Sequence, residues 1–306
     1  MPTIAAGSRR RLAYIPEVTW GTTPATPTLQ ILRNTGGAGI QMERNAQQSN
    51  EMRSDRAIAD VRMGIQRASL DVPFELSYGT YDDLLEAALF GTWTTNVLKQ
   101  GVTRRQFTFE EGFTDINVFI PARGGVVNTM QLQFQPEGAM VTGSFGLIFK
   151  AQGTATGTTL ATATTPANTE PVFDSFKGSI KKGVTTLAVA TQIDLNLNNN
   201  VDALFSLFNE EAFGVAVGRA DLTGSFTAYF TGLAEINEFV NESEVALEIE
   251  TEDLDGNSYL IEIPRVKWTG NTRNLTENTI TQQIPFQALY DATEETTIKI
   301  TRVDAV

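Results

Sequence analysis

Apolar and polar residues alternate along much of this chain, which is the pattern of strands buried on one face only. From residue 68 to residue 78 every even position is apolar, and the odd positions are polar except for Pro73. Pro73 cannot donate to a strand ladder, so it predicts an edge or a bulge. Asp255-Gly256 predicts a hairpin turn between two further alternating segments. We therefore predict a mainly β chain, with further strands near residues 40–43, 193–197, 222–230, 245–250 and 259–263.

Two short segments interrupt the alternation, one in each half of the chain. Within residues 81–90, four apolar residues fall on one face at helical spacing, namely Leu84, Leu85, Ala88 and Leu89. We predict a helix here, capped by Thr80 and Asp83 and ended by Gly91. A second helix is predicted at residues 233–240.

The two halves also resemble each other in sequence. Three segments match in order: 67–74 with 219–226, 116–121 with 259–264, and 149–151 with 286–288. The offset falls from 152 to 143 to 137 residues, as trimmed loops in a second copy would give. We predict an internal duplication, with Phe74 and Phe226 as core residues at equivalent places. The alternative is that alternating chains share such short matches by chance.

A segment rich in Thr, Ala and Gly separates the halves. Residues 153–169 carry no charge and no periodicity, which is typical of a linker or a long loop. We predict a first domain at 1–152, a linker at 153–170 and a second domain at 171–306.

Composition narrows the chemistry that this chain can perform. It has no Cys and no His, which excludes disulfides, thiolate metal sites and the commonest catalytic bases. The net charge of −13 argues against a protein that grips phosphate. Residues 1–152 hold 14 basic and 14 acidic residues, whereas residues 153–306 hold 9 and 22. No apolar run is long enough to span a membrane and none follows the pattern of a signal peptide, so we expect a chain made in a cytoplasm.

Two acidic segments are compatible with a hydrolase site and a calcium site, but we favour a structural interpretation of each. Residues 235–262 hold ten carboxylates and no Lys or Arg, and a carboxylate pair could serve a hydrolase that cleaves glycans. These carboxylates recur along one segment, so we favour a surface that faces solvent or a partner. Residues 253–257 hint at a calcium loop but lack its ligand spacing, and we favour a hairpin turn. We predict no catalytic residue, no cofactor and no metal site.

A long polar loop at about residues 48–66 is a candidate contact with another molecule. It carries Arg53, Asp55, Arg56 and Arg62 but no aromatic residue that could stack on a base. It is also longer than a simple hairpin turn requires. We expect it to contact a protein partner rather than nucleic acid, and its arginines to meet the acidic second half of a neighbour.

Several segments resemble phage tail tube (major tail) proteins. They are residues 17–24, 49–56, 75–93, 259–264 and 286–291, of which 75–93 is the most specific. The resemblance implies two tail-tube-like β-sandwich domains, each with a short flanking helix and a hairpin that contributes to an inner β-barrel. In that family six such domains surround a lumen, so two domains per chain imply three chains per ring. The rings stack into the tube through which DNA is ejected.

The same resemblance implies partners and a location. The partners would be further copies of the chain, the tape measure and terminator proteins of the tail, and double-stranded DNA that passes without specific binding. The location would be the virion tail of a phage with a long non-contractile tail, assembled in the host cytoplasm. The main alternative is a β-sandwich binding module of the virion surface or of an adhesin.

Strand alternation selects candidates for the lumen wall. If Leu70, Val72 and Phe74 face the core, then Asp71 and Glu75 must face the other way. The same parity selects a polar set of nine: Glu43, Asn45, Asp71, Glu75, Gln131, Gln133, Asp194, Asn196 and Asn198. A wall without Lys or Arg would not hold phosphates. The alternative is that these residues face bulk water outside a tube.

Overall fold

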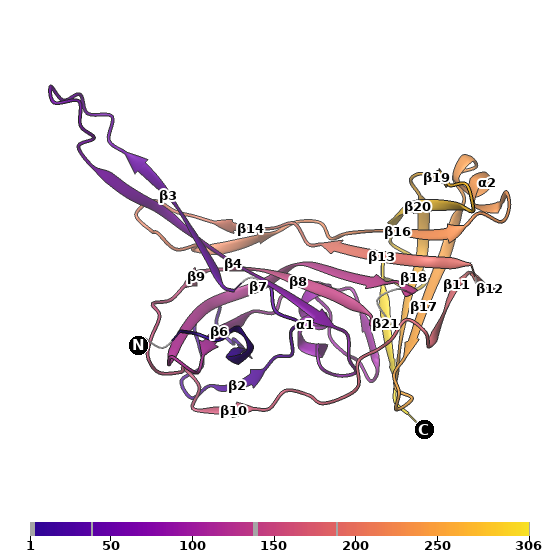
Figure 1. Cartoon of the computed structure of the whole chain (residues 1–306), viewed down its shortest axis with the longest axis horizontal. Helices are drawn as coiled ribbons and strands as arrows, with labels where there is room; N and C mark the ends of the chain where they lie inside the picture. The colour runs from indigo at the N-terminus through magenta and orange to yellow at the C-terminus, as the bar shows by residue number, and fades with distance from the viewer. Residues whose placement is uncertain (1–3, 38, 137–139, 188, 306) are drawn as a thin grey trace.

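The computed structural model describes residues 4–37, 39–136, 140–187 and 189–305, and it is mainly β, as predicted (Figure 1). The strands of the first half are β1 (Arg10–Pro16), β2 (Thr28–Ile31), β3 (Gln41–Gln48), β4 (Val61–Glu75), β5 (Val97–Lys99), β6 (Phe107–Phe113), β7 (Val118–Phe134), β8 (Thr142–Phe149), β9 (Ala151–Gln152) and β10 (Ala163–Thr165). Those of the second half are β11 (Gly178–Lys182), β12 (Thr185–Thr186), β13 (Ala190–Asn198), β14 (Val201–Leu204), β15 (Gly214–Val217), β16 (Asp221–Tyr229), β17 (Glu244–Glu252), β18 (Ser258–Trp268), β19 (Thr272–Leu275), β20 (Ile280–Ala288) and β21 (Lys299–Val303). A 3-10 turn, η1 (Gly7–Arg9), and two helices, α1 (Asp82–Leu89) and α2 (Ala234–Val240), complete the elements.

The two halves follow one order of paired strands. In the first half the pairing runs β1-β6-β7-β8-β4-β3. In the second half it runs β11-β17-β18-β20-β16-β13, and β19 continues β18 along β20. Each helix follows the counterpart strand of its half, β4 or β16. The second half thus repeats the strand plan of the first.

The registers of the two plans also agree for two of the three sequence matches. Ala151 lies opposite Arg123 on β7, and Ala288 lies opposite Val266 on β18. Further along, Gly143 lies opposite Leu132, and Ile280 lies opposite Leu275. In both comparisons the residue on β8 or β9 is 137 residues before its counterpart on β20. The residue on β7 is 143 residues before its counterpart on β18 or β19. These are the offsets of the two sequence matches.

The third sequence match is displaced by four residues. Leu70 lies opposite Leu147, and Phe226 lies opposite Ile284, which is the counterpart of Leu147 at the offset of 137. The counterpart of Phe226 is therefore Leu70, and the expectation that it would be Phe74 was wrong. A displacement by an even number keeps the alternation intact, so the sequence pattern does not reveal it. The expected burial of Phe74 and Phe226 is confirmed.

One ladder joins the two plans edge to edge. β7 and β13 pair antiparallel over six residue pairs, from Thr129 opposite Asn198 to Phe134 opposite Ile193. A second contact lies at the other end, where β5 pairs with β21 and the hydroxyl of Tyr259 donates to Asp82 at 3.0 Å. A single hydrophobic core runs through both halves as a result.

The segment predicted as a linker lies along the first half. β10 pairs in parallel with β2, and the backbone N–H of Leu160 and the hydroxyl of Thr159 both donate to the buried carboxylate of Glu110. A chain that carries no charge can lie on a sheet edge in this way because its own backbone supplies the hydrogen bonds.

Helix α1 is held by burial. Leu84, Leu85, Ala88 and Leu89 are buried, as the spacing predicted. The predicted cap was wrong, because the Thr80 hydroxyl pairs with Ser77 and Asp83 accepts from Tyr14. The helix ends at Leu89, and its C-cap is Phe90, whose φ of 50° lies in the left-handed region, one residue before the expected Gly91.

Helix α2 is held differently, since none of its residues is buried. Its Glu235 and Glu238 bind the ammonium of Lys182 on β11, each at 2.9 Å, and Glu238 also accepts from the indole of Trp268 at 2.9 Å. Burial alone would lower the pKa of Lys182, but the two carboxylates outweigh it and raise that pKa. Burial likewise opposes ionisation of Glu235, but Lys182 lowers its pKa overall.

Pro73 lies on a stretch of β4 that β3 does not reach, so the predicted edge position is confirmed. Within the described residues, no helix has the length and apolar character that crossing a bilayer requires.

We expect Phe226→Ala to lower the free energy of unfolding by roughly 3–5 kcal/mol, because it empties a fully buried aromatic site. The side chain is 2% exposed and packs on Trp268 with ring centres 5.3 Å apart. Urea denaturation of the unassembled protein measures it. The matched control is Phe208→Ala at a fully exposed phenylalanine, which we expect to stay within about 0.5 kcal/mol of the parent. Equal losses in the two variants would contradict the assignment of Phe226 to the core.

We expect Glu235→Gln to destabilise the chain near pH 7 and to cost less as the pH falls. A carboxyl whose pKa is lowered by folding contributes stability above its ordinary pKa of about 4.3, and that contribution is lost as the pH falls through the lowered value. Urea denaturation of parent and variant at pH 7 and pH 3 measures the difference. Glu277→Gln, at an exposed carboxyl outside the cluster, is the control. A difference that grows toward pH 3 would refute the Lys182 pairing.

Candidate functional site

The polar residues selected by strand parity gather on one face of the joined sheet. Three rows cross β4, β8, β7, β13 and β16, each made of residues that lie opposite one another. The rows are Asp71–Gly146–Thr129–Asn198–Asp221, Pro73–Ser144–Gln131–Asn196–Thr223 and Glu75–Thr142–Gln133–Asp194–Ser225. Seven of the nine candidates therefore share one face that extends across both halves.

Hydrogen bonds tie this face together at the junction of the halves. The carboxylate of Asp194 accepts from the amide of Gln133 at 2.9 Å, from that of Gln192 at 2.8 Å and from the hydroxyl of Ser225 at 3.4 Å. The three rows contain acids, amides and hydroxyls but no Lys or Arg. A hollow of about 230 Å³ lies over Gln131, Gln133, Asp194 and Asn196. The face is thus polar and weakly acidic.

The remaining two candidates lie on β3. Glu43 continues the same parity one strand further out, where it lies opposite Arg67, a basic residue on the same face beyond the three rows. Asn45 falls where the register between β3 and β4 shifts, so strand parity assigns it no face.

The joined sheet is open at both ends. Within the described residues, β3 pairs only with β4, and β19 pairs only with β20. All four residues of β19 and seven of the eight residues of β3 are exposed. Unpaired strand edges of this kind are templates for another strand.

Two hairpin arms project from the sheet, one from each half (Figure 1). The second arm, residues 199–218, contains β14 and β15 and folds back over the first half. Glu210 binds Arg44 at 2.7 Å, and the guanidinium of Arg67 lies 5.0 Å from the ring centre of Phe205. The backbone bonds from Gln66 to Glu210 and from Ala212 to Lys150 add to this contact. Sequence reasoning missed the arm, and its signal is the Asn198-Asn199-Asn200 run that interrupts an alternating strand.

The first arm, residues 45–64, is the distal part of the β3–β4 hairpin and extends away from the rest of the chain (Figure 1). Pairing continues out to Gln48 opposite Val61, so the polar loop spans residues 49–60 and is shorter than predicted. Arg53, Asp55 and Arg56 lie in that loop, whereas Arg62 lies on β4. Arg53 binds Asp55 and Arg62 binds Asp60 locally. Apolar side chains on the same arm are exposed, among them Met52, Ile58 and Met63.

One buried polar group at the open β19 edge has no partner. Asn271 lies between β18 and β19, and its amide nitrogen is buried and donates to no described residue. Its counterpart in the first half is Asn128, at the offset of 143. The second arm bonds to both oxygens of Asn128, because the backbone carbonyl accepts from the N–H of Asn199 and the side-chain oxygen accepts from the N–H of Val201.

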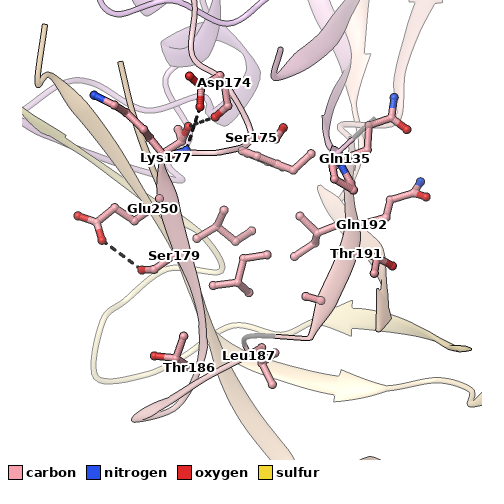
Figure 2. Close-up of a pocket in the computed structure, with 18 residues that line it drawn as sticks. Gln135, Asp174, Ser175, Lys177, Ser179, Thr186, Leu187, Thr191, Gln192 and Glu250 are labelled. Atoms are coloured by element: carbon pink, nitrogen blue, oxygen red, sulfur yellow. Dashed lines mark hydrogen bonds between the residues drawn. The ribbon is translucent and has the colours of Figure 1, made fainter. Parts of the chain in front are cut away.

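A hollow of about 310 Å³ lies between β11, β13 and β17 and the end of β7 (Figure 2). Asp174 at its mouth accepts from the backbone N–H of Phe176 and Lys177, and Glu250 accepts from the hydroxyl of Ser179. Ser175 has a buried hydroxyl without a partner. The charged groups that line this hollow are thus engaged in local hydrogen bonds.

The acidic stretch at 235–262 is spread over several contacts. Glu242, Glu244 and Glu248 bind Lys267, Arg265 and Lys181 respectively. The turn at 253–257 is a hairpin turn, as favoured from the sequence, because the carboxylate of Asp253 accepts from the backbone N–H of Asp255 and Asn257 at 2.9 Å. These four carboxylates are therefore engaged in structural contacts, and Glu250 of the same stretch lines the hollow of Figure 2.

A comparison with protein families finds one match that spans most of the chain. The family model, described as phage tail tube protein, matches residues 7–288. None of the curated proteins compared matches the chain.

Proposed function

The chain belongs to the family of phage tail tube proteins, and from that premise we propose that three copies close into a ring of pseudo-sixfold symmetry. The rings stack into a tube through which phage DNA is ejected. The family is a structural one and not an enzyme family, and it assigns the chain to the virion tail.

The ladder between β7 and β13 carries this proposal. It joins the two similar strand plans, because residues 129–134 of β7, beyond the stretch that pairs with β6, pair with β13, the outermost strand of the second plan. The contact is head-to-tail because it joins two different kinds of edge. A head-to-tail contact that is repeated closes into a ring when its rotation allows closure. The open edges at β3 and β19 are the same two kinds of edge, left free for the next copy.

The division of the chain supports counting two domains per copy. We assign the first domain to 1–152 and the second to 171–306, with 153–170 as the connection. Each assigned domain holds one complete strand plan with one helix. A ring of six domains then needs three chains.

The polar face is the proposed lumen wall. Its rows run without a break across the junction of the halves, and they lack the Lys and Arg that would pair with phosphates. A weakly acidic wall repels DNA only at short range, because salt screens charges beyond about 10 Å. DNA therefore passes such a wall without being held by it.

The remaining partners follow from this role. The tape measure and terminator proteins of the tail would be its other protein partners. Assembly would take place in the host cytoplasm. Membership of the tube family favours this function over a virion surface or adhesin module.

Symmetry analysis of electron micrographs of the assembled protein should give three chains per ring. The physical reason is that a ring of six domains has six domain–domain junctions, and each chain supplies one of every two through its internal β7–β13 ladder. A ring of six chains, or monomers at all concentrations, would contradict the proposal.

Replacing Asp71, Glu75 and Asp194 together by arginine should leave tubes intact but slow DNA ejection. The new cations would bind phosphates, and the delay should shrink as salt is raised. Ejection from purified virions, followed by dye fluorescence, measures it. The matched control replaces the same residues by Asn, Gln and Asn, which removes charge without adding cations. Unchanged ejection in the arginine variant would place this face outside the lumen.

A further inference from the structure

The junction inside the chain provides a template for the junction between chains. On the β7 side Leu132 is 2% exposed and on the β13 side Leu195 is 1% exposed; the two lie opposite each other in the ladder and belong to the same core. Next to them Gln131 lies opposite Asn196 on the polar face.

The counterpart of the β7 edge is β19. Leu132 lies opposite Gly143, and its counterpart Leu275 lies opposite Ile280. Leu275 is 72% exposed, since nothing in the described chain covers this edge. A groove of about 530 Å³ runs along it, lined by Phe230, Asn271, Thr272, Arg273, Leu275 and Ile280.

The counterpart of β13 is β3, which the registers establish in two steps. From Phe149, the opposite residue on β4 is Ala68, and the residue opposite that on β3 is Met42. From Phe286, the same two steps lead through Gly224 to Leu195. Met42 is therefore the counterpart of Leu195, and it is 44% exposed.

We infer that β3 of a second copy docks antiparallel along β19 in the register of the β7–β13 ladder. Met42 of that copy then lies opposite Leu275, and Glu43 lies opposite Asn274. Two apolar side chains that are exposed in the single chain cover each other, as Leu195 and Leu132 do. The side chain of Asn271 then lies beside the backbone at the start of the first arm, as the side chain of Asn128 lies beside Asn199 and Val201. The inference rests on the proposed ring and specifies its contact.

The first arm follows from the same template. The second arm crosses the first half next to the β7–β13 ladder, so the first arm of one copy crosses the second half of the next. Its exposed Ile58, Val61 and Met63 supply the apolar contact that Val201 and Val215 supply in the second arm. Arg53, Asp55, Arg56 and Arg62 would then contact the neighbouring subunit.

The net charge of each arm is complementary to the charge of the face on which it docks. The second arm carries Asp202, Glu210 and Glu211 with no basic residue, and it meets Arg44, Arg67 and Lys150. The counterparts of these bases on the second half are Leu197, Thr223 and Gln287. The first arm is correspondingly neutral, with three arginines and three acids. Each arm thus suits the docking face of the other half and not that of its own.

Paired cysteines test the register, and the absence of native Cys leaves no background. Residues directly opposite in a ladder have Cα atoms about 4.5–5.5 Å apart, which a disulfide spans. We expect Met42→Cys with Leu275→Cys on one chain to yield covalent trimers after mild oxidation of assembled protein. The matched control, Met42→Cys with Arg273→Cys, shifts the pair by two residues to about 7–8 Å and should yield few.

Electron microscopy of the same samples before oxidation tests ring formation separately from the β3–β19 register. Rings that form while only the control pair links would overturn the register and leave the proposed function standing. The absence of rings in the cysteine-free parent would overturn both. Linked trimers in the first pair and not in the control support the inference.

The arm is tested separately by replacing residues 49–60 with Asn-Gly, a two-residue turn that the paired Gln48 and Val61 can accept. Rings of this variant should dissociate at a lower urea concentration than parental rings, while the cysteine pair still links. Equal urea resistance would show that the arm does not dock on the neighbour.

Discussion

The backbone ladder between β7 and β13 is the constraint on which the rest of the chain depends. It places a polar row from each half in one line, so that Gln133 and Asp194 bond across the junction. It also merges the apolar sides of both halves into one core. Side chains alternate with a period of two, so a slip of one residue would turn Asp194 into that core and Leu195 out of it. The register that buries the apolar face of the joined sheet therefore also determines which polar side chains lie on the opposite face.

The sequence alone predicted what depends on local periodicity. Alternation assigned Leu70 and Phe74 to the core and Asp71 to the opposite face, and helical spacing assigned the buried side of α1. It could not supply the pairing partners, because an edge such as β19 looks like any other polar strand until its neighbours are known. The displaced match at 219–226 shows the same limit, since any even shift preserves the pattern. The sequence did not predict the second arm or the unpaired Asn271, because both depend on contacts between residues that are distant in the sequence.

The halves share a plan but differ in how they are stabilised. Helix α1 is fixed by five buried side chains, whereas α2 relies on carboxylates that bind Lys182 and Trp268. The acidic excess of the second half is partly explained by this substitution of ion pairs for apolar burial. An ion pair tolerates exposure better than a bare apolar helix does, which suits a unit whose outer edge is left open.

The covalent connection between the two halves has a kinetic consequence for assembly. Bringing two free molecules together costs translational and rotational freedom worth about 4–15 kcal/mol per encounter. A tethered pair avoids that cost, because one half meets the other at a high effective concentration. The β7–β13 junction forms as the chain folds, so only every second junction around a closed ring would wait for diffusion. In the proposed ring, a chain with two linked halves would therefore need fewer bimolecular encounters to close than single halves would.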